Sequence, residues 1–544
     1  MGLFIKILFI ALFFVVTIFI GFYCRKKAQN SNDFVLGGRN VGPWLSAFAY
    51  GTSYFSAVIF IGYAGSFGKL FGVAAFWIGI GNALIGSWLA WALLGRKTRI
   101  MTQHFNSSTM PDFFAKRFKS EGLRIFAAII IFVFLIPYTA ALYNGLADLF
   151  GVAFSTAVPY WVWILIIAVA TGVYVIVGGL MSTAVNSFIQ GLIMLVGIAL
   201  VVVFALRLNG GLMGSFKELA EHGWQFTSLF GPDPVHLLFV VLLTSLGCWG
   251  LPQMVSKFYS IKNENQIRKG SVISTVFAIV VAGGCYFLGG FALLFVNDAG
   301  NTSIIPYIVS QLPMVVIAIV IVLVLAASMS TLSGLVHTSA STVTFDLLDR
   351  KKQMPEKKKM TWLRSLVVVF IVISAGLAIF QSLDGVPANL KKDIASLMGI
   401  SWGAISGAFI GPFFYGLYWK KTTKASVYAS FIVGIVVSVV GLSLSLAGVN
   451  AKIVTNSSGF TICWFNFADS IYMGVLAMVL SFIIVPVVSS FTKKPEDVEE
   501  MFKCYSKKVT VTSDIALTEK GENAEEKALT PEAVEETQSY VEEE

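Results

Sequence analysis

Long apolar runs without a single charge dominate this chain as far as about position 490. Six of them exceed the roughly 20 residues that a helix needs to cross a bilayer: Leu70–Gly95, Ile125–Ala147, Ser271–Asn297, Ile394–Trp419, Ala425–Ala451 and Ser470–Thr492. A longer run, Leu149–Leu206, holds two helices, because Pro159 and the pair Gly178–Gly179 divide it. The pattern predicts thirteen spans, near 3–23, 44–66, 72–95, 124–146, 158–178, 184–206, 236–257, 271–296, 313–340, 363–383, 394–419, 425–448 and 470–491.

The composition agrees with a membrane protein. Of the 544 residues, 56% are hydrophobic and only 13% are charged, whereas soluble proteins average about a quarter charged residues. This balance excludes an ordinary soluble enzyme and a disordered chain. Five cysteines are too few for a disulfide scaffold and lack the spacing of a metal site. We therefore expect an all-α polytopic membrane protein that is not an enzyme and carries no cofactor.

The basic residues gather in alternate loops. The loops after predicted spans one, three, seven, nine and eleven contain 25 Lys and Arg residues, against six in the loops of the other side. By the positive-inside rule, the N-terminus lies outside and the C-terminus lies in the cytoplasm of a cell-membrane protein. This topology explains the net charge of +9, so no nucleic-acid partner is expected. Residues 492–544 carry a net charge of −8 and predict a largely disordered acidic tail with no identifiable partner.

Two predicted spans are rich in residues that interrupt helices. Ala47–Ala57 lies in span two and Thr244–Gln253 in span seven, and each would begin a five-helix unit. Because five spans separate the two starts, the units cross the membrane in opposite senses. Inverted repeats of this kind are typical of secondary transporters, which bind their substrate near the midplane between two broken helices. The alternative is that the small residues only allow close helix packing.

Span nine ends in a run of hydroxyl residues. In that helix the carbonyl of Ala327 lies near the hydroxyls of Ser330 and Thr331, because positions three or four apart share a face. Neutral oxygens without a carboxylate suit a weakly held monovalent cation. The alternative is that the hydroxyls bond back to carbonyls of the preceding turn.

Several segments together resemble the sodium/solute symporter family across most of residues 1–490. Besides span two, they are Asp33-Phe-Val-Leu-Gly-Gly-Arg39, Ser187-Phe-Ile-Gln190, Gly250-Leu-Pro-Gln253, Ser328-Met-Ser-Thr-Leu-Ser-Gly334 and Tyr418-Trp-Lys-Lys-Thr-Thr423. The family includes carriers of proline, pantothenate, sialic acid and galactose. The resemblance implies thirteen spans, an outside N-terminus and a LeuT-type five-plus-five core.

The resemblance also implies a sodium site, and sodium is the only metal ion expected. Its ligands would be the carbonyls of Thr52, Phe55 and Ala327 and the hydroxyls of Ser330 and Thr331. Some members bind a second sodium ion through an aspartate in span six and a further hydroxyl in span nine. Here Ser187 and Gly334 stand at those positions. We therefore expect one sodium ion per substrate.

By the same resemblance, the substrate pocket would draw on spans two, three, seven and eleven. The candidates are Ser53, Tyr54, Ser56, Asn82, Ser245, Trp249 and Trp402. Asn82 has a structural alternative as a bridge between two helices, and the tryptophans have one as packing or interfacial residues.

The residues give conflicting evidence about the substrate. Proline carriers have an aspartate where this chain has Tyr54, a position that looks closer to the pantothenate carriers, whereas the sequence after Trp402 is similar to proline carriers. Helix N-termini and amides can still bind a carboxylate without a charged side chain. A small zwitterion such as proline or a monocarboxylate such as pantothenate is thus the leading substrate. Sugars and sialic acid are the alternatives.

The sequence thus predicts a sodium-coupled symporter that imports a small solute by alternating access. A membrane sensor that binds solute without moving it, or a channel without coupling to sodium, are the rival classes. The expected organisation is a first span and loop (1–43), two five-helix repeats (44–207 and 236–419) joined by an outer loop (208–235), two peripheral spans (420–491) and the tail (492–544).

Overall fold

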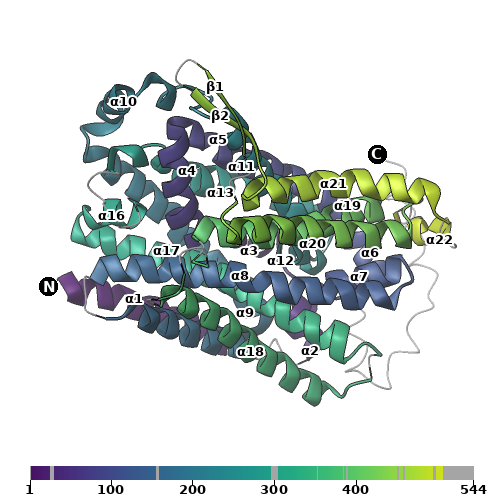
Figure 1. The fold of residues 1–544 in the computed structure, drawn as a ribbon. Helices are drawn as coiled ribbons and strands as arrows, with labels where there is room; N and C mark the ends of the chain where they lie inside the picture. Colours follow the sequence, from purple (N-terminus) through teal and green to yellow (C-terminus); the bar gives the residue numbers. More distant parts are fainter. Residues whose placement is uncertain are drawn as a thin grey trace, which may run out of the picture. The chain divides into compact units, whose positions relative to one another are not determined.

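The computed structural model describes residues 2–24, 30–154, 158–295, 304–351, 353–383, 385–387, 390–391, 393–449, 452–457, 460–493 and 498–505. Within residues 1–505, the long helices lie side by side as a bundle and run between its two ends (Figure 1). Most of the predicted acidic tail, residues 506–544, lies outside the described residues, as do Arg25, Lys26 and Lys27 of the first basic loop.

The first half of the chain contains the first predicted broken span. Its elements are α1 (Gly2–Cys24), α2 (Ser31–Leu36), the 3-10 turn η2 (Gly37–Arg39), α3 (Pro43–Tyr54), the π-helical η3 (Val58–Tyr63), α4 (Ala64–Phe71), η4 (Gly72–Ala75), α5 (Phe76–Gly81), η5 (Asn82–Leu89), η6 (Trp91–Gly95), α6 (Arg96–His104), α7 (Met110–Arg117), α8 (Glu121–Phe154), α9 (Tyr160–Arg207), α10 (Gly211–Glu221) and η7 (Trp224–Phe226). After Tyr54 the backbone becomes extended at Phe55 (φ −102°, ψ 131°) before the helix resumes, which confirms the break in span two.

The second half contains the second broken span. Its elements are α11 (Pro234–Leu246), η8 (Gly247–Gly250), α12 (Pro252–Ser260), α13 (Asn265–Ala278), η9 (Ile279–Gly283), α14 (Gly284–Gly289), η10 (Ala292–Phe295), α16 (Ile304–Ser310), α17 (Met314–Thr342), η11 (Val343–Leu348), α18 (Glu356–Ser382), α19 (Ile394–Tyr418), α20 (Lys424–Leu446), β1 (Lys452–Ser457), β2 (Phe460–Asn466), α21 (Ser470–Phe491), α22 (Val498–Phe502) and η12 (Lys503–Tyr505). Leu251 is extended, and the helices on its two sides meet at an angle of 47°. Pro252 supplies the second helix with a first residue that needs no backbone N–H.

The number of spans differs from the predicted thirteen. Among the described residues, ten helices are long and apolar enough to cross a membrane, or eleven if α11 and α12 form one bent span. Two predicted spans account for much of the difference. The second half of span two and span three are counted together as Val58–His104, although the backbone turns between them at Gly72 (φ 61°, ψ −142°), and predicted span 158–178 supplies only the short apolar helix Tyr160–Val173. The predicted division at Gly178–Gly179 is a kink inside α9, where Gly179 has φ 59° and ψ −168°.

Short polar side chains fix where several helices begin. The side chains of Thr109, Asp233, Asp393, Thr423 and Asp469 each accept a hydrogen bond from a backbone N–H in the first turn of the following helix. These groups satisfy donors that have no partner inside the helix. The cap residues therefore fix the positions at which these helices begin and the preceding loops end.

A two-stranded antiparallel hairpin lies between α20 and α21, a departure from the predicted all-α fold. Asp233 holds it in place, because its Oδ2 accepts from the backbone N–H of Cys463 (3.1 Å) while its Oδ1 caps α11. The Tyr472 hydroxyl also donates to the Cys463 carbonyl (2.9 Å). We call the end of the bundle that bears this hairpin the hairpin side; the other end, which bears α2, α7 and α22, is the basic side (Figure 1).

The start of the predicted tail is folded rather than disordered. On the basic side, η12 places the Tyr505 hydroxyl 3.1 Å from the carbonyl of Leu417, to which it donates. The Lys97 ammonium lies over the Tyr505 ring (4.7 Å), and the Arg117 guanidinium lies over the Phe502 ring (5.1 Å). Two aromatic side chains therefore anchor residues 498–505, which belong to the predicted tail.

Glycine allows one unusually close helix contact. On the hairpin side, a Cβ at Gly68 of α4 would collide with the backbone of Gly289 at the end of α14, and a Cβ at Gly289 would collide with the carbonyl of Ala64. These two helices therefore touch backbone to backbone.

Candidate functional site

The break after α3 lies directly against the middle of α17. The Thr331 hydroxyl is 3.4 Å from the carbonyl oxygen of Thr52, 3.3 Å from that of Phe55 and 3.2 Å from that of Ala327. The extended backbone at Phe55 frees these α3 carbonyls from helical bonding. Three carbonyl oxygens from two helices thus converge on one hydroxyl, at the positions expected for the sodium ligands.

Ser330 completes this oxygen cluster. Its hydroxyl donates to Thr52 Oγ1 (2.7 Å) and lies 3.3 Å from the hydroxyl of Ser187 on α9. All of these residues are buried. The described residues contain no group of three or more His, Cys, Asp or Glu that could hold a metal ion. Neutral oxygens in a buried site are suited to a monovalent hard cation rather than a transition metal. The alternative of simple back-bonding explains only the contact of Thr331 with Ala327.

A neighbouring contact was not predicted from the sequence. The Ser328 hydroxyl accepts a hydrogen bond from the backbone N–H of Ala57 (3.1 Å), on the other side of the break. The sequence signal was present in the hydroxyl run of span nine, but the direction of Ser328 depends on the packing of α17. Carbonyls before the break and an N–H after it therefore all bond to α17.

Three aromatic rings form a cluster beside the break. The Trp402 indole of α19 lies edge-to-face against Tyr54 (6.2 Å between centroids) and Tyr138 (5.9 Å). The Tyr54 hydroxyl donates to the Thr244 carbonyl of α11, so it joins the two broken helices. The Trp402 Nε1 and the Ser56 hydroxyl both face the Tyr138 hydroxyl, but among the described residues none of these three buried atoms makes a hydrogen bond of normal geometry. Such groups carry a desolvation cost that a polar ligand can offset.

The remaining substrate candidates are divided between two places. Asn82 Oδ1 accepts from the Ser245 hydroxyl (3.0 Å) and so bridges η5 and α11, while Asn82 Nδ2 makes no hydrogen bond of normal geometry among the described residues. Ser53 donates to the Ala49 carbonyl in its own helix (2.6 Å). The contacts of Trp249 lead away from the aromatic cluster, because its Nε1 donates to the Ile85 carbonyl and its ring stacks on Phe414. The geometry thus groups Tyr54, Ser56 and Trp402, adds Tyr138, and places Trp249 in packing.

A broad cavity of about 1160 Å³ opens on the hairpin side. Its lining includes Ile61 and Gly62 of η3 and Ala395 of α19. Beneath it, the Tyr63 hydroxyl donates to the Ala395 carbonyl (3.3 Å) and joins the two helices. The cavity therefore reaches the helix that follows the break, but the residues of the aromatic cluster are not part of its lining.

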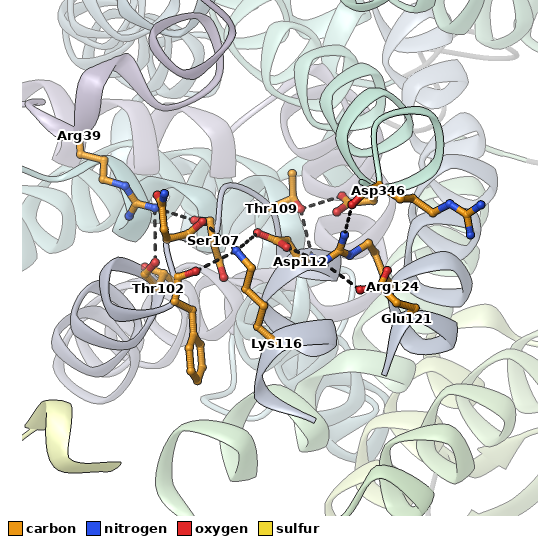
Figure 2. Close-up of polar contacts among 12 residues, drawn as sticks. Arg39, Thr102, Ser107, Thr109, Asp112, Lys116, Glu121, Arg124 and Asp346 are labelled. Atoms are coloured by element: carbon orange, nitrogen blue, oxygen red, sulfur yellow. Dashed lines mark hydrogen bonds and ion pairs between the residues drawn. The ribbon is translucent and has the colours of Figure 1, made fainter. Parts of the chain in front are cut away.

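On the basic side, a network of ion pairs and hydrogen bonds joins α7, α8 and η11. Figure 2 shows Asp112 between Lys116 and Arg124, each with a nitrogen 2.8 Å from one of its oxygens. The Thr109 hydroxyl donates to Asp346 Oδ2 (2.7 Å). Arg39 Nη2 donates to the carbonyl of Ser107 (2.6 Å), and burial lowers the pKa of this guanidinium. This side of the bundle is therefore closed by charge-assisted contacts.

Comparison with known proteins agrees with this architecture. Residues 34–434 match the model of the sodium:solute symporter family. The chain belongs to the sodium:solute symporter family. It is similar to the osmoregulated proline transporter OpuE of Bacillus subtilis, with 26% identity over 90% of this chain and 95% of the relative. It is also 28% identical to a sodium/proline symporter of Staphylococcus aureus, over 89% of this chain and 92% of that one.

A solved structure supports the fold of this family member. A Na⁺-coupled sialic acid symporter in a substrate-bound outward-open state matches with a TM-score of 0.71 and 16% identity, over 90% of this chain and 98% of the other. The predicted LeuT-type fold, with a five-plus-five helical core, is thereby confirmed. The chain is a multi-pass membrane protein of a transporter family whose coupling ion is sodium.

Proposed function

We propose that this protein is a sodium-coupled symporter that imports a small organic solute by alternating access. The observation that carries the proposal is the convergence of Thr52, Phe55 and Ala327 carbonyls on the Thr331 hydroxyl at the break. With Ser330, these groups form the proposed sodium site. At the positions of the second sodium site, Ser187 stands in place of the aspartate and Gly334 in place of a hydroxyl residue. We therefore propose one sodium ion per substrate.

The leading substrate is a small zwitterion such as proline, and a monocarboxylate such as pantothenate is the second. Family members of similar sequence are named as proline transporters. The proposed pocket is the cluster of Tyr54, Ser56, Tyr138 and Trp402, with an aromatic wall for an apolar ring and unpartnered polar atoms for a charged or polar group. Asn82 and Ser245 form its far edge, and Ser53 lies one residue before Tyr54.

The two sides of the bundle suggest how transport proceeds. By the positive-inside rule, the basic side faces the cytoplasm of the cell membrane and the hairpin side faces outward. In this structure a broad cavity lies on the hairpin side, charge-assisted contacts join elements on the basic side, and the proposed sodium and substrate residues are buried, which corresponds to an occluded arrangement with its wider opening on the hairpin side. Sodium would join the break after α3 to α17 and favour this arrangement. Substrate and sodium would thereby each raise the affinity for the other.

Uptake of labelled proline into proteoliposomes tests this proposal. We expect accumulation only with an inward sodium gradient, and competition by the true substrate class among pantothenate, other amino acids, sialic acid and sugars. Binding without accumulation would indicate a sensor, and flux that ignores sodium would indicate a channel. No proline uptake by protein shown to be folded would move the lead to pantothenate, tested in the same way.

A further inference from the structure

A buried lysine without a partner lies between the proposed sodium site and the basic side. Lys257, on α12, is only 4% exposed. Among the described residues, no hydrogen bond or ion pair reaches its amine, and the lining of the cavity beside it contains no carboxylate. A buried cation is costly unless something pairs with it. Lys257 therefore needs an explanation that packing alone does not provide.

Lys257 lines a small cavity together with His337 of α17. The volume of about 30 Å³ is enough for about one water molecule. His337 is 7% exposed, and its Nε2 has no hydrogen-bond partner. Two nitrogen-bearing side chains, from the second broken helix and from α17, thus line one small space with seven hydroxyl residues but, among the described lining residues, with no anionic partner.

The position of this cavity connects it with the proposed substrate pocket. Gly334, which also lines the cavity, lies one helical turn beyond Thr331 on the basic side. A Cβ at Gly334 would lie 3.9 Å from the hydroxyl of Ser53. Because Gly334 has no side chain, little separates Ser53 from the cavity. Leu180 and Thr183, which follow the Gly179 kink of α9, form another wall.

We propose that Lys257, assisted by His337, binds the carboxylate of the substrate as it leaves the pocket toward the basic side. The inference rests on the proposed function and on its lead substrates, which all carry a carboxylate. None of the residues proposed for the substrate pocket is charged. Lys257, an unpaired cation beside the exit path, supplies the positive charge that the pocket lacks. When the basic side opens, the cavity would widen, and the carboxylate would become the missing partner of Lys257.

The test compares Lys257→Gln with wild type on the two faces of the membrane. Right-side-out vesicles present the outer face, and inside-out vesicles present the basic side. With labelled proline, we expect the half-saturating concentration at the outer face to change less than twofold. At the basic side it should rise about tenfold, the effect of losing one bond to a charged group.

Three controls make the result specific. Lys257→Arg should retain wild-type values at both faces, and Lys262→Gln, at an exposed lysine nearby, should change neither. Prolinamide, which lacks the carboxylate, should compete equally well at the basic side in wild type and Lys257→Gln. A melting temperature of purified Lys257→Gln equal to that of wild type shows that the variant is folded.

Some outcomes would overturn the inference. These are an unchanged basic-side value in Lys257→Gln, an equal change at both faces, loss of transport in Lys257→Arg as well as Lys257→Gln, or an equal effect on prolinamide. Absence of sodium-driven uptake by the wild type would instead overturn the proposed function itself, so the two failures are distinguishable.

Discussion

Removing the Thr331 hydroxyl should specifically weaken sodium binding. This hydroxyl lies within 3.2–3.4 Å of the carbonyls of Thr52, Phe55 and Ala327, and it is one of five proposed ligands. Thr331→Ala keeps the helix and removes one oxygen that would contact a full charge. The loss of a bond to a charged group costs about 1.5–3 kcal/mol. That range corresponds to a roughly 10- to 150-fold higher half-saturating sodium concentration.

The assay is the initial rate of labelled proline uptake over a series of sodium concentrations. Because the two ligands are coupled, the apparent affinity for proline should fall at low sodium and recover when sodium saturates. Thr331→Ser retains the hydroxyl and should behave nearly as wild type.

Thr344→Ala is the matched control for this variant. Thr344 is also buried, and its hydroxyl donates to the carbonyl four residues earlier, that of Ala340 (2.8 Å). Thr344→Ala therefore loses the same kind of intrahelical hydrogen bond as Thr331→Ala, but Thr344 does not contact the helix break after α3. A sodium dependence of Thr331→Ala within twofold of wild type would refute the proposed site. An equal shift in Thr344→Ala would show that the effect comes from the helix.

Three further variants test other parts of the structure. Trp402→Phe removes a buried N–H that has no partner and should raise the half-saturating proline concentration about 3- to 10-fold in uptake, with sodium dependence unchanged at saturating proline. Asp112→Asn leaves Arg124 with a weaker partner and should lower the melting temperature of the purified protein, at a cost of up to about 3–5 kcal/mol, whereas Glu121→Gln, an exposed partner of the same arginine, should not. Lys420→Ala breaks an exposed ion pair with α22 and should cost less than about 1 kcal/mol in the same melting experiment.

Local chemistry explains which parts of the fold were predictable. Closely spaced glycine, serine and proline residues weaken a helix, so the breaks at Phe55 and Leu251 could be expected from the residues around them. The helical spacing of Ala327 and Thr331 brought their oxygens together on one face, and the family resemblance added Thr52. These features depend on residues near one another in the chain or on a shared motif.

Features that depend on distant packing were not predictable. Tyr138 lies in an apolar span with no signal of its own, and its contact with Trp402 arises only when α8 packs against α19. The polar composition of the tail concealed two aromatic anchors, Phe502 and Tyr505, which bind a surface formed by other segments. The predicted count of thirteen spans is not confirmed, because an apolar run does not reveal whether the helix inside it stops or continues.

The contact between Gly68 and Gly289 has a consequence for how this sequence can diversify. Where two backbones touch, even alanine requires the helices to separate, so neither position can change alone. Exchanges at lipid-facing positions of α1 meet no such barrier, because little of that helix is covered by protein. Among descendants of this chain, substitutions should accumulate rapidly on the outer helices, while this glycine pair stays fixed whatever solute each descendant carries.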